Sequence, residues 1–373
     1  MQGQHRHFMI FGNKAFWMGA IGSAVFLAVF VVVFVDFDTI GDVLSGANYT
    51  FVAPSLFFYS LAVGFRTGRW KFLLRPLIGK PERSIYTVVV VGYMANNLIP
   101  LRIGEVVRSY YLSLREKCSV SAALGTVAVE RATDVVALLF FLAAAGLMGT
   151  VGVDRAVGDI SSSVPGGAVV LALFTLLPFI AVLGFVAVVS TASRETVIRW
   201  LDRSMFMIER GLRDRLLGVA DRLLEGLMEG LTVLSSPSDM LKIFLWSVPI
   251  WAAEAAMYYL IALGFDLRPI FDSQLEFIAV ILVFTSAANL AGVVPSTAGG
   301  WGPFDVFGAL ALVALGVESG LAGTYAVTVH VILWVPPTVL GAVILIADGR
   351  SLRGLMRGVK ESEQPITGEE STS

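Results

Sequence analysis

The chain has 373 residues, of which 56% are hydrophobic and only 15% are charged, and its mean hydropathy is +0.78. Soluble domains of this length have a smaller fraction of apolar residues and a larger fraction of charged ones. The composition therefore predicts an all-α polytopic membrane protein. A formal net charge of -2 offers no bulk attraction for nucleic acid, which excludes a nucleic-acid partner.

Cysteine and histidine are too scarce for a structural metal site. The single cysteine, Cys118, excludes an internal disulfide and a cysteine cluster, and His5, His7 and His330 are too far apart in sequence to suggest zinc ligation. We therefore expect no metal and no cofactor. The apolar run after Lys14 has no small-residue cleavage site, so it is predicted to be a first transmembrane helix rather than a signal peptide.

Six segments approach the roughly 20 apolar residues that a helix needs to cross a bilayer. They are residues 15–35, 49–65, 120–151, 166–191, 240–265 and 321–347. Two further apolar stretches, 85–101 and 275–315, contain Asn, Pro and Gly, which predicts broken or re-entrant helices. We expect one transmembrane domain over residues 1–347 with six full spans and two broken elements, or six to eight spans in all.

Basic residues set the predicted orientation. They crowd residues 66–83, after the second span, and residues 194–222, so the positive-inside rule places both segments and both termini in the cytoplasm. Each broken element must then return to the side from which it entered. This arrangement gives two inverted halves, residues 15–151 and 166–347, as in many transporters.

Two segments are predicted to lie outside the membrane. Between residues 194 and 232, apolar residues recur every three or four positions among charges, which predicts an amphipathic cytoplasmic helix. Its role is either structural, on the membrane surface or the bundle, or regulatory. Residues 348–373 are predicted to form a polar cytoplasmic tail that is disordered after Lys360.

The first broken element ends in the stretch NNLIPLRIGEVVR, residues 96–108. Pro100 blocks helix continuation, so we expect the amides of Asn96 and Asn97 to serve the carbonyls that it frees. A new helix should begin near Ile103.

Charged side chains follow this break. Arg102 and Arg108 add positive charge, and Glu105 is placed to hold Arg108 by an ion pair until an anion competes for the arginine. Such a site suits a phosphate or a similar anionic headgroup. In the alternative, both arginines snorkel to the cytoplasmic headgroups.

Three charged residues in the third span form a patch one helical turn tall. Arg131 and Asp134 are three residues apart, and Glu130 and Asp134 are four apart. Because a charge facing lipid near the bilayer centre costs roughly 2.5–3.5 kcal/mol, these residues either line a polar cavity or lie at the cytoplasmic interface as an anchoring ion pair.

The second broken element contains the stretch PSTAGGWGPFD, residues 295–305, in which glycine and proline prevent a continuous helix. Asp305 is placed near the start of the next helix. It is either a helix-terminal charge or, with Asn289 and Thr297, part of a polar lining.

Two isolated polar residues in the spans are candidates for proton coupling. Glu254 stands alone in the fifth span, and His330 lies in the last. The simpler interpretation of His330 is a hydrogen-bonded interior residue, and Glu254 remains open between coupling and a structural hydrogen bond.

Together these motifs resemble a known family. The pattern N-x-x-P-x-R-x-G-E-x-x-R over residues 97–108, followed by E-R-x-x-D over 130–134 and the glycine-rich stretch, is similar to the flippase-like family typified by the transmembrane domain of lysylphosphatidylglycerol synthases. The resemblance implies an inner (plasma) membrane protein that moves a polar-headgroup lipid between leaflets. Family members are associated with aminoacylated phosphatidylglycerol, polyprenyl-phosphate-linked sugars and hopanoid-related lipids.

Two departures from the family matter. The synthases carry a large soluble domain after their membrane part, whereas this chain continues only into a short polar segment, so aminoacyltransferase activity is not implied. The family motif usually ends in Glu where this chain has Asp305, which is one methylene shorter.

The expected function is therefore that of a transporter, not an enzyme, whose partner is a membrane lipid with a phosphate-containing headgroup. One alternative is a membrane glycosyltransferase that uses a lipid-linked donor, with Asp36 and Asp38 binding a metal and a diphosphate. Another is a non-catalytic scaffold for a lipid-biosynthesis enzyme. The sequence leaves open the lipid, the energy source and whether the chain forms a homo-oligomer.

Overall fold

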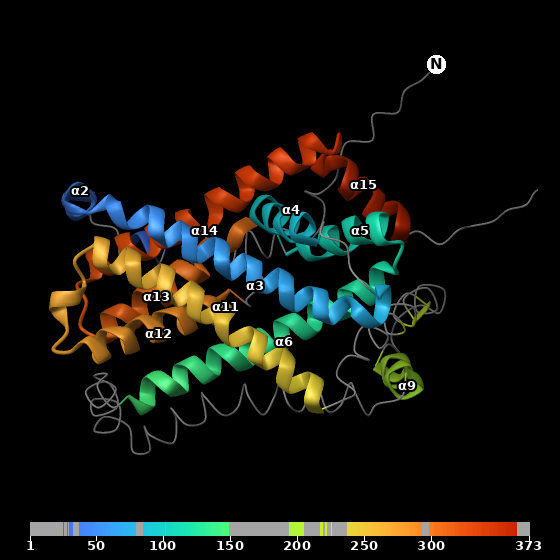
Figure 1. The fold of residues 1–373 in the computed structure, drawn as a ribbon, viewed down its shortest axis with the longest axis horizontal. Coiled ribbons are helices and arrows are strands. Elements are labelled where there is room, and N and C mark those ends of the chain that lie inside the picture. The colour runs from blue at the N-terminus through green and yellow to red at the C-terminus, as the bar shows by residue number, and fades with distance from the viewer. Residues whose placement is uncertain are drawn as a thin grey trace, which may run out of the picture.

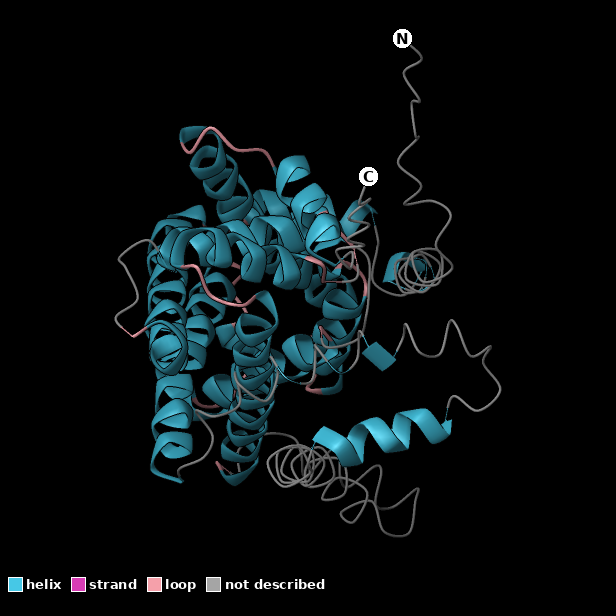
Figure 2. Ribbon diagram, turned by 90° about the vertical axis from the view of Figure 1, so that its right-hand side faces the viewer, coloured by secondary structure: helices cyan, strands magenta, loops and turns pink. Residues whose placement is uncertain are grey.

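The structure, a computed structural model, describes residues 37–79, 85–100, 102–148, 194–204, 237–292 and 298–363, with a few single residues elsewhere. Its helices are α2 (Phe37–Gly46), α3 (Val52–Ile78), α4 (Ile85–Leu98), α5 (Gly104–Glu116), α6 (Val120–Leu147), α9 (Arg194–Ser204), α11 (Pro237–Gly264), α12 (Gln274–Ala291), α13 (Pro303–Ala314), α14 (Ser319–Ala347) and α15 (Leu352–Glu363). Three short 3₁₀ turns join them: Tyr49–Phe51, Arg268–Ile270 and Ala298–Gly300. No strand occurs among the described residues (Figures 1 and 2).

Apolar length identifies the membrane helices. Most of α11, all of α12 and all of α14 are long and apolar enough to cross a bilayer, and α4 and α13 are shorter apolar helices. The long helices α3 and α6 have 27 and 28 residues but carry charged side chains inside the bundle. The chain is an all-α multi-pass membrane protein, as its composition predicted.

Both predicted broken elements are helical hairpins. Helix α4 ends before Pro100, and α5 begins at Gly104 and packs against α4. Helix α12 ends at Ala291, and α13 begins at Pro303 and packs against α12. Positive φ angles occur at both breaks, at Arg102 in the first and at three glycines in the second. A left-handed backbone cannot continue an α-helix, so the chain reverses at both places.

The two halves repeat one another in order and in contacts. Helices α3, α4, α5 and α6 have 27, 14, 13 and 28 residues, and α11, α12, α13 and α14 have 28, 18, 12 and 29. Helix α3 packs along its counterpart α11, while α4 packs on α14 and α12 packs on α6 (Figure 1). Exchanging the halves preserves these contacts, as an internal repeat requires.

The predicted end of the second span was wrong. We expected it to stop at residue 65 and to release a basic cytoplasmic loop, but α3 continues to Ile78 and buries Arg66 and Arg69. The helix tolerates these charges because carboxylates of α6 and α11 face them. Three of the arginines that supported the orientation, Arg66, Arg69 and Arg75, therefore lie in a helix and not in a loop.

The predicted polar tail also needs correction, because residues 352–363 form α15. Leu355 and Val359 are buried on one side of α15, which packs on α5, so a short amphipathic stretch folds against the bundle. At the end of α14, the hydroxyl of Tyr111 donates to Asp348, and this hydrogen bond together with Arg115 lowers the pKa of the Asp348 carboxyl.

Some predictions fall outside the described residues. Of the predicted cytoplasmic helix at 194–232, the structure describes α9 and a few single residues beyond it. The predicted span 166–191 and most of 15–35 also lie outside the described part.

The close approach of α4 and α5 depends on glycine. A Cβ on Gly104 would lie 2.3 Å from the backbone nitrogen of Asn96 and 2.6 Å from the carbonyl oxygen of Gly92. Backbone atoms cannot move aside as a flexible side chain can, so any larger residue must force the hairpin apart.

We expect Gly104→Ala to lower the free energy of unfolding by about 1–3 kcal/mol, the usual cost of overpacking. Thermal unfolding of the purified protein in detergent measures this. Gly64→Ala in α3 is the control, because a Cβ at Gly64 would meet no atom within 4 Å. Equal stability of the two variants would show that the hairpin is not packed as described.

Candidate functional site

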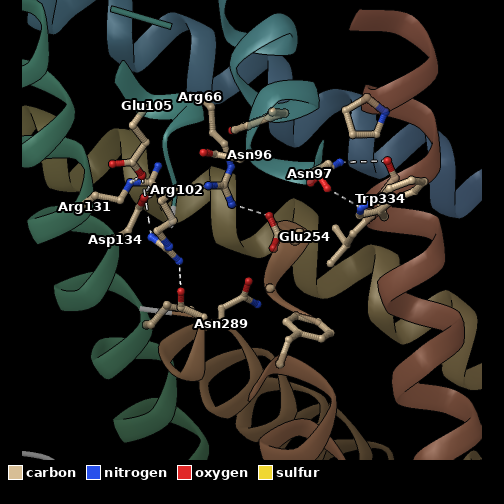
Figure 3. A pocket seen from close by; sticks show the side chains of 18 of the residues that line it. Arg66, Asn96, Asn97, Arg102, Glu105, Arg131, Asp134, Glu254, Asn289 and Trp334 are labelled. Atoms are coloured by element: carbon tan, nitrogen blue, oxygen red, sulfur yellow. Dashed lines mark hydrogen bonds and ion pairs between the residues drawn. The ribbon is translucent and has the colours of Figure 1, made fainter. Parts of the chain in front are cut away.

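A polar cavity of about 720 Å³ lies between the two helical hairpins (Figure 3). Helices α3, α4, α6, α11 and α14 and both breaks contribute to its walls. Nine of the predicted site and coupling residues line it: Asn96, Asn97, Arg102, Glu105, Arg131, Asp134, Glu254, Asn289 and His330. The volume falls in the range of small-molecule sites, which is sufficient for a lipid headgroup.

The innermost charge is Arg69 of α3, whose side chain is 0% exposed. Its Nη1 donates to Oδ1 of Asp134 at 2.7 Å and to the hydroxyl of Ser247 at 2.6 Å, and its Nη2 lies 3.6 Å from Glu130. One arginine of α3 therefore joins two acids of α6, one helical turn apart, to a hydroxyl of α11.

Arg66, one turn earlier on α3, extends the network to α11. It donates to Glu254 and lies 4.0 Å from Asp134, and its guanidinium stacks 4.5 Å from the ring centroid of Trp251. The other carboxylate oxygen of Glu254 accepts the hydroxyl of Tyr258 at 2.8 Å. The expected lone Glu254 is thus an ion-paired residue.

Arg108 pairs with a different acid from the one we predicted. Its partner is Glu130 of α6 rather than Glu105, and it lies 4.2 Å from the ring of Trp70. The prediction failed because α5 packs Arg108 inward against α6, whereas Glu105 faces the cavity. Arg108 and Glu130 lie behind the cavity wall and support it.

Arg102 and Arg131 are the accessible cations of this network, at 35% and 34% side-chain exposure. Both lie 3.8 Å from Glu105, which they share, and Arg131 is also 3.2 Å from Asp134, as the i, i+3 spacing predicted. Arg102 reaches across the cavity and donates to the carbonyl of Gly292, the residue that follows α12 (Figure 3). One side chain thus bridges the two breaks.

Formal charge does not balance within the described part of this site. Five arginines meet four carboxylates: Arg66, Arg69, Arg102, Arg108 and Arg131, with Glu105, Glu130, Asp134 and Glu254. One positive charge is left in excess. Because Arg102 has only the longer, shared contact to Glu105, this excess lies at the accessible end of the network.

Within the described residues, the Asn97 amide does not serve the carbonyls freed by Pro100, contrary to our expectation. The amide of Asn97 donates to the carbonyl of Trp334 at 3.0 Å and to the hydroxyl of Thr338 at 2.9 Å, so it fastens α4 to α14. Oδ1 of Asn96 is buried and has no hydrogen-bond partner in the described residues. The Asn97 amide donates to α14 instead, because this neighbouring helix lies within its reach.

Asn289 of α12, Asp305 of α13 and His330 of α14 lie around the second break. The amide of Asn289 donates to Tyr258 at 3.1 Å and to the carbonyl of Thr285 at 2.9 Å. Asp305 lies behind the wall, where it accepts the Gly302 amide at 2.9 Å and pairs with His330 at 2.8 Å. Its shorter side chain does reach a partner. Thr297 lies outside the described residues.

Sequence reasoning missed Arg66 and Arg69 because a basic cluster after an apolar run is typical of a cytoplasmic loop. A usable signal was present. Three acids in the predicted spans needed cations, and Arg131 alone cannot balance them.

The fold and the cavity define a class of protein: a polytopic membrane protein with an ion-paired polar cavity between two broken helical hairpins. The chain belongs to the family of the lysylphosphatidylglycerol synthase transmembrane region, whose model matches residues 19–341. This membership confirms the resemblance found in the sequence. No solved structure matches the chain.

Several archaeal proteins are similar to this chain. A UPF0104 membrane protein of Methanothermobacter thermautotrophicus is 27% identical over 348 residues, which are 88% of this chain and 92% of the relative. Glycosyltransferase AglD of Haloferax volcanii is 25% identical over 289 residues, 73% of this chain but 45% of AglD. UPF0104 membrane protein MJ1595 of Methanocaldococcus jannaschii is 32% identical over 114 residues, 30% of this chain and 34% of that protein. The chain therefore spans less than half of AglD.

Replacing Arg69 with Met should lower the free energy of unfolding by about 3–5 kcal/mol, because two buried acids would lose the fully buried cation that they share. Unfolding in a denaturing detergent measures the loss. Arg75→Met on the exposed side of α3 is the control and should change stability little. A small effect of Arg69→Met would contradict the pairing described for α3 and α6.

Proposed function

We propose that this protein moves a lipid with an anionic, phosphate-containing headgroup between the leaflets of the plasma membrane. The observation that carries the proposal is the cavity itself, because an accessible excess positive charge lies inside a bundle of apolar helices. Charges in such a place are costly unless they serve a polar pathway.

Phosphate chemistry matches the accessible arginines. Arg102 and Arg131 present planar guanidinium groups on one side of the cavity, and such groups bind phosphate oxygens through paired hydrogen bonds. One negative charge on the headgroup neutralises the excess charge of the site. The acyl or prenyl tails remain in the surrounding lipid.

The link between Arg102 and Gly292 suggests how headgroup binding and movement are connected. In the structure this side chain joins the first hairpin to the residue that follows α12. A phosphate that competes for Arg102 releases the link, so the two hairpins become free to shift relative to one another. Headgroup binding and the movement of the hairpins then depend on the same contact between Arg102 and Gly292.

The family supports a lipid substrate, and within it we favour aminoacylated phospholipids, polyprenyl-phosphate-linked sugars or hopanoid-type lipids. Exposed arginines at 350, 353 and 357, beside the last span, favour a cytoplasmic C-terminus. The N-terminus is proposed to share that side.

The name of AglD supports a second candidate, a glycosyltransferase that uses a lipid-linked donor. Asp36 and the side chain of Asp38, the proposed metal ligands, lie outside the described residues. Incubation of the purified protein with a polyprenyl-phosphate sugar, an acceptor and a divalent cation tests this candidate. Metal-dependent transfer of the sugar would favour the enzyme over the transporter.

We expect Arg102→Gly to slow lipid translocation at least tenfold while leaving the fold intact. Arg102 has a φ of 55°, which glycine adopts without strain, so relief of about 1–3 kcal/mol offsets the lost contacts. Translocation of a fluorescent phosphatidylglycerol in reconstituted vesicles measures the rate.

Arg353→Gln, which removes an exposed arginine of α15, is the control and should translocate at the wild-type rate. Arg102→Lys keeps the charge but not the planar fork and should be intermediate. A wild-type rate in the stably folded Arg102→Gly protein would refute the headgroup site.

A further inference from the structure

His330 of α14 is held at both ring nitrogens. Nδ1 lies 2.8 Å from Oδ1 of Asp305, and Nε2 lies 2.9 Å from the carbonyl oxygen of Gly299. The side chains of His330 and Asp305 are 4% and 2% exposed, yet His330 reaches the cavity wall. Because both ring nitrogens have fixed partners, the number of hydrogens on the ring can be deduced from those partners.

The proton count follows from the chemistry of the two partners. The Gly299 carbonyl can only accept, so Nε2 must carry a hydrogen. Nδ1 faces a carboxylate oxygen, and two lone pairs cannot face each other at 2.8 Å. A further proton therefore lies between Nδ1 and Asp305, whichever of the two atoms carries it. With this proton the pair is neutral overall, and without it the pair has a charge of -1.

The same proton holds the glycine loop at 298–302. His330 binds the Gly299 carbonyl, and Oδ2 of Asp305 accepts the Gly302 amide at 2.9 Å. Without the shared proton, the imidazole must give up either Asp305 or Gly299, since a neutral ring has one donor. Gly299 and Gly300 line the cavity with positive φ angles, so the loop that the pair holds is part of the site.

The other groups near His330 do not supply a hydrogen between Nδ1 and Asp305. The ring stacks on Trp301 at 4.1 Å and lies 4.8 Å from Phe304. The titratable groups that share the cavity from neighbouring helices are Tyr59 of α3, Tyr93 of α4, Arg102, Glu105, Arg131, Asp134, and Arg66 and Glu254 from the α3–α11 contact. Both oxygens of Glu254 already accept hydrogen bonds, from Arg66 and Tyr258.

We propose that the Asp305–His330 pair is a proton-binding site that makes movement of the anionic headgroup proton-coupled. This proposal rests on the proposed function. The arginine network carries one excess positive charge, so the cavity has a charge of +1 when the pair is protonated and of zero when it is not. The proton therefore strengthens anion binding, and the anion strengthens proton binding equally, because linkage is reciprocal. When the pair is deprotonated, its proton passes to water at the cavity wall.

The proton itself can be observed without any transport measurement. The chain contains three histidines, so His5→Gln with His7→Gln leaves His330 as the only imidazole. Nitrogen NMR of the ¹⁵N-histidine-labelled protein at about pH 5, the acidic end of the range in which histidines usually change charge, should show a hydrogen at Nε2 and a hydrogen shared between Nδ1 and Asp305. A bare Nδ1 with no shared hydrogen would overturn the proposal.

The coupling is tested by two variants with opposite expected effects. Asp305→Asn removes the carboxylate, so the pair can no longer become negative, and the amide can donate to Nδ1 of a neutral imidazole. Translocation in this variant should therefore not fall as the pH rises. His330→Gln leaves the Asp305 carboxylate unneutralised, so translocation should be slow at every pH. A purely structural pair would make both variants equally defective.

The probe is fluorescent phosphatidylglycerol in reconstituted vesicles, with rates compared from about pH 5 to pH 8, where histidines usually change charge. The wild-type rate should fall about tenfold across this range, a typical coupling strength. A wild-type rate independent of pH would overturn the coupling. Absence of translocation at any pH would instead refute the proposed function, and the NMR measurement would still decide whether the proton is present.

Discussion

The fold depends on pairing the arginines of α3 with carboxylates of other helices. Arg69 has no exposure and touches Glu130 and Asp134 of α6, while Arg66, one turn earlier, reaches Glu254 of α11. Any one of these charges alone would be costly inside an apolar bundle. Together they fix how three long helices pack, because each guanidinium can satisfy its acids only in one relative placement of the helices.

The ion-paired packing of α3, α6 and α11 positions the two helical breaks around the cavity. Each half reverses its chain in the bundle interior, at Arg102 in one half and at the glycines after Gly292 in the other. Helix ends and irregular backbone are tolerated at membrane depth where they line a polar cavity. Arg102 joins the two breaks directly, so the least compensated cation of the network lies where the halves meet. Charge and backbone geometry thus converge on one cavity.

The same requirement, that buried polar groups have partners, applies to the proton shared by Asp305 and His330. Two buried polar side chains satisfy each other and two backbone groups of the glycine loop, which leaves one hydrogen shared between them. The loop could be built differently in a soluble protein, where water would replace either partner. In a membrane interior each unmatched group is costly, so the proton belongs to the structure.

The sequence by itself determined the fold class, the two broken elements, the internal repeat and nine of the residues that line the cavity, because apolar length, glycine and proline act locally along the chain. It misjudged the end of α3, the partner of Arg108, the role of the asparagine amides and the helix after residue 351. Each of these features depends on which side chain of a distant helix lies within reach. Only the tertiary structure decided them, since a buried charge or amide takes the partner that packing brings to it and not the nearest one in sequence.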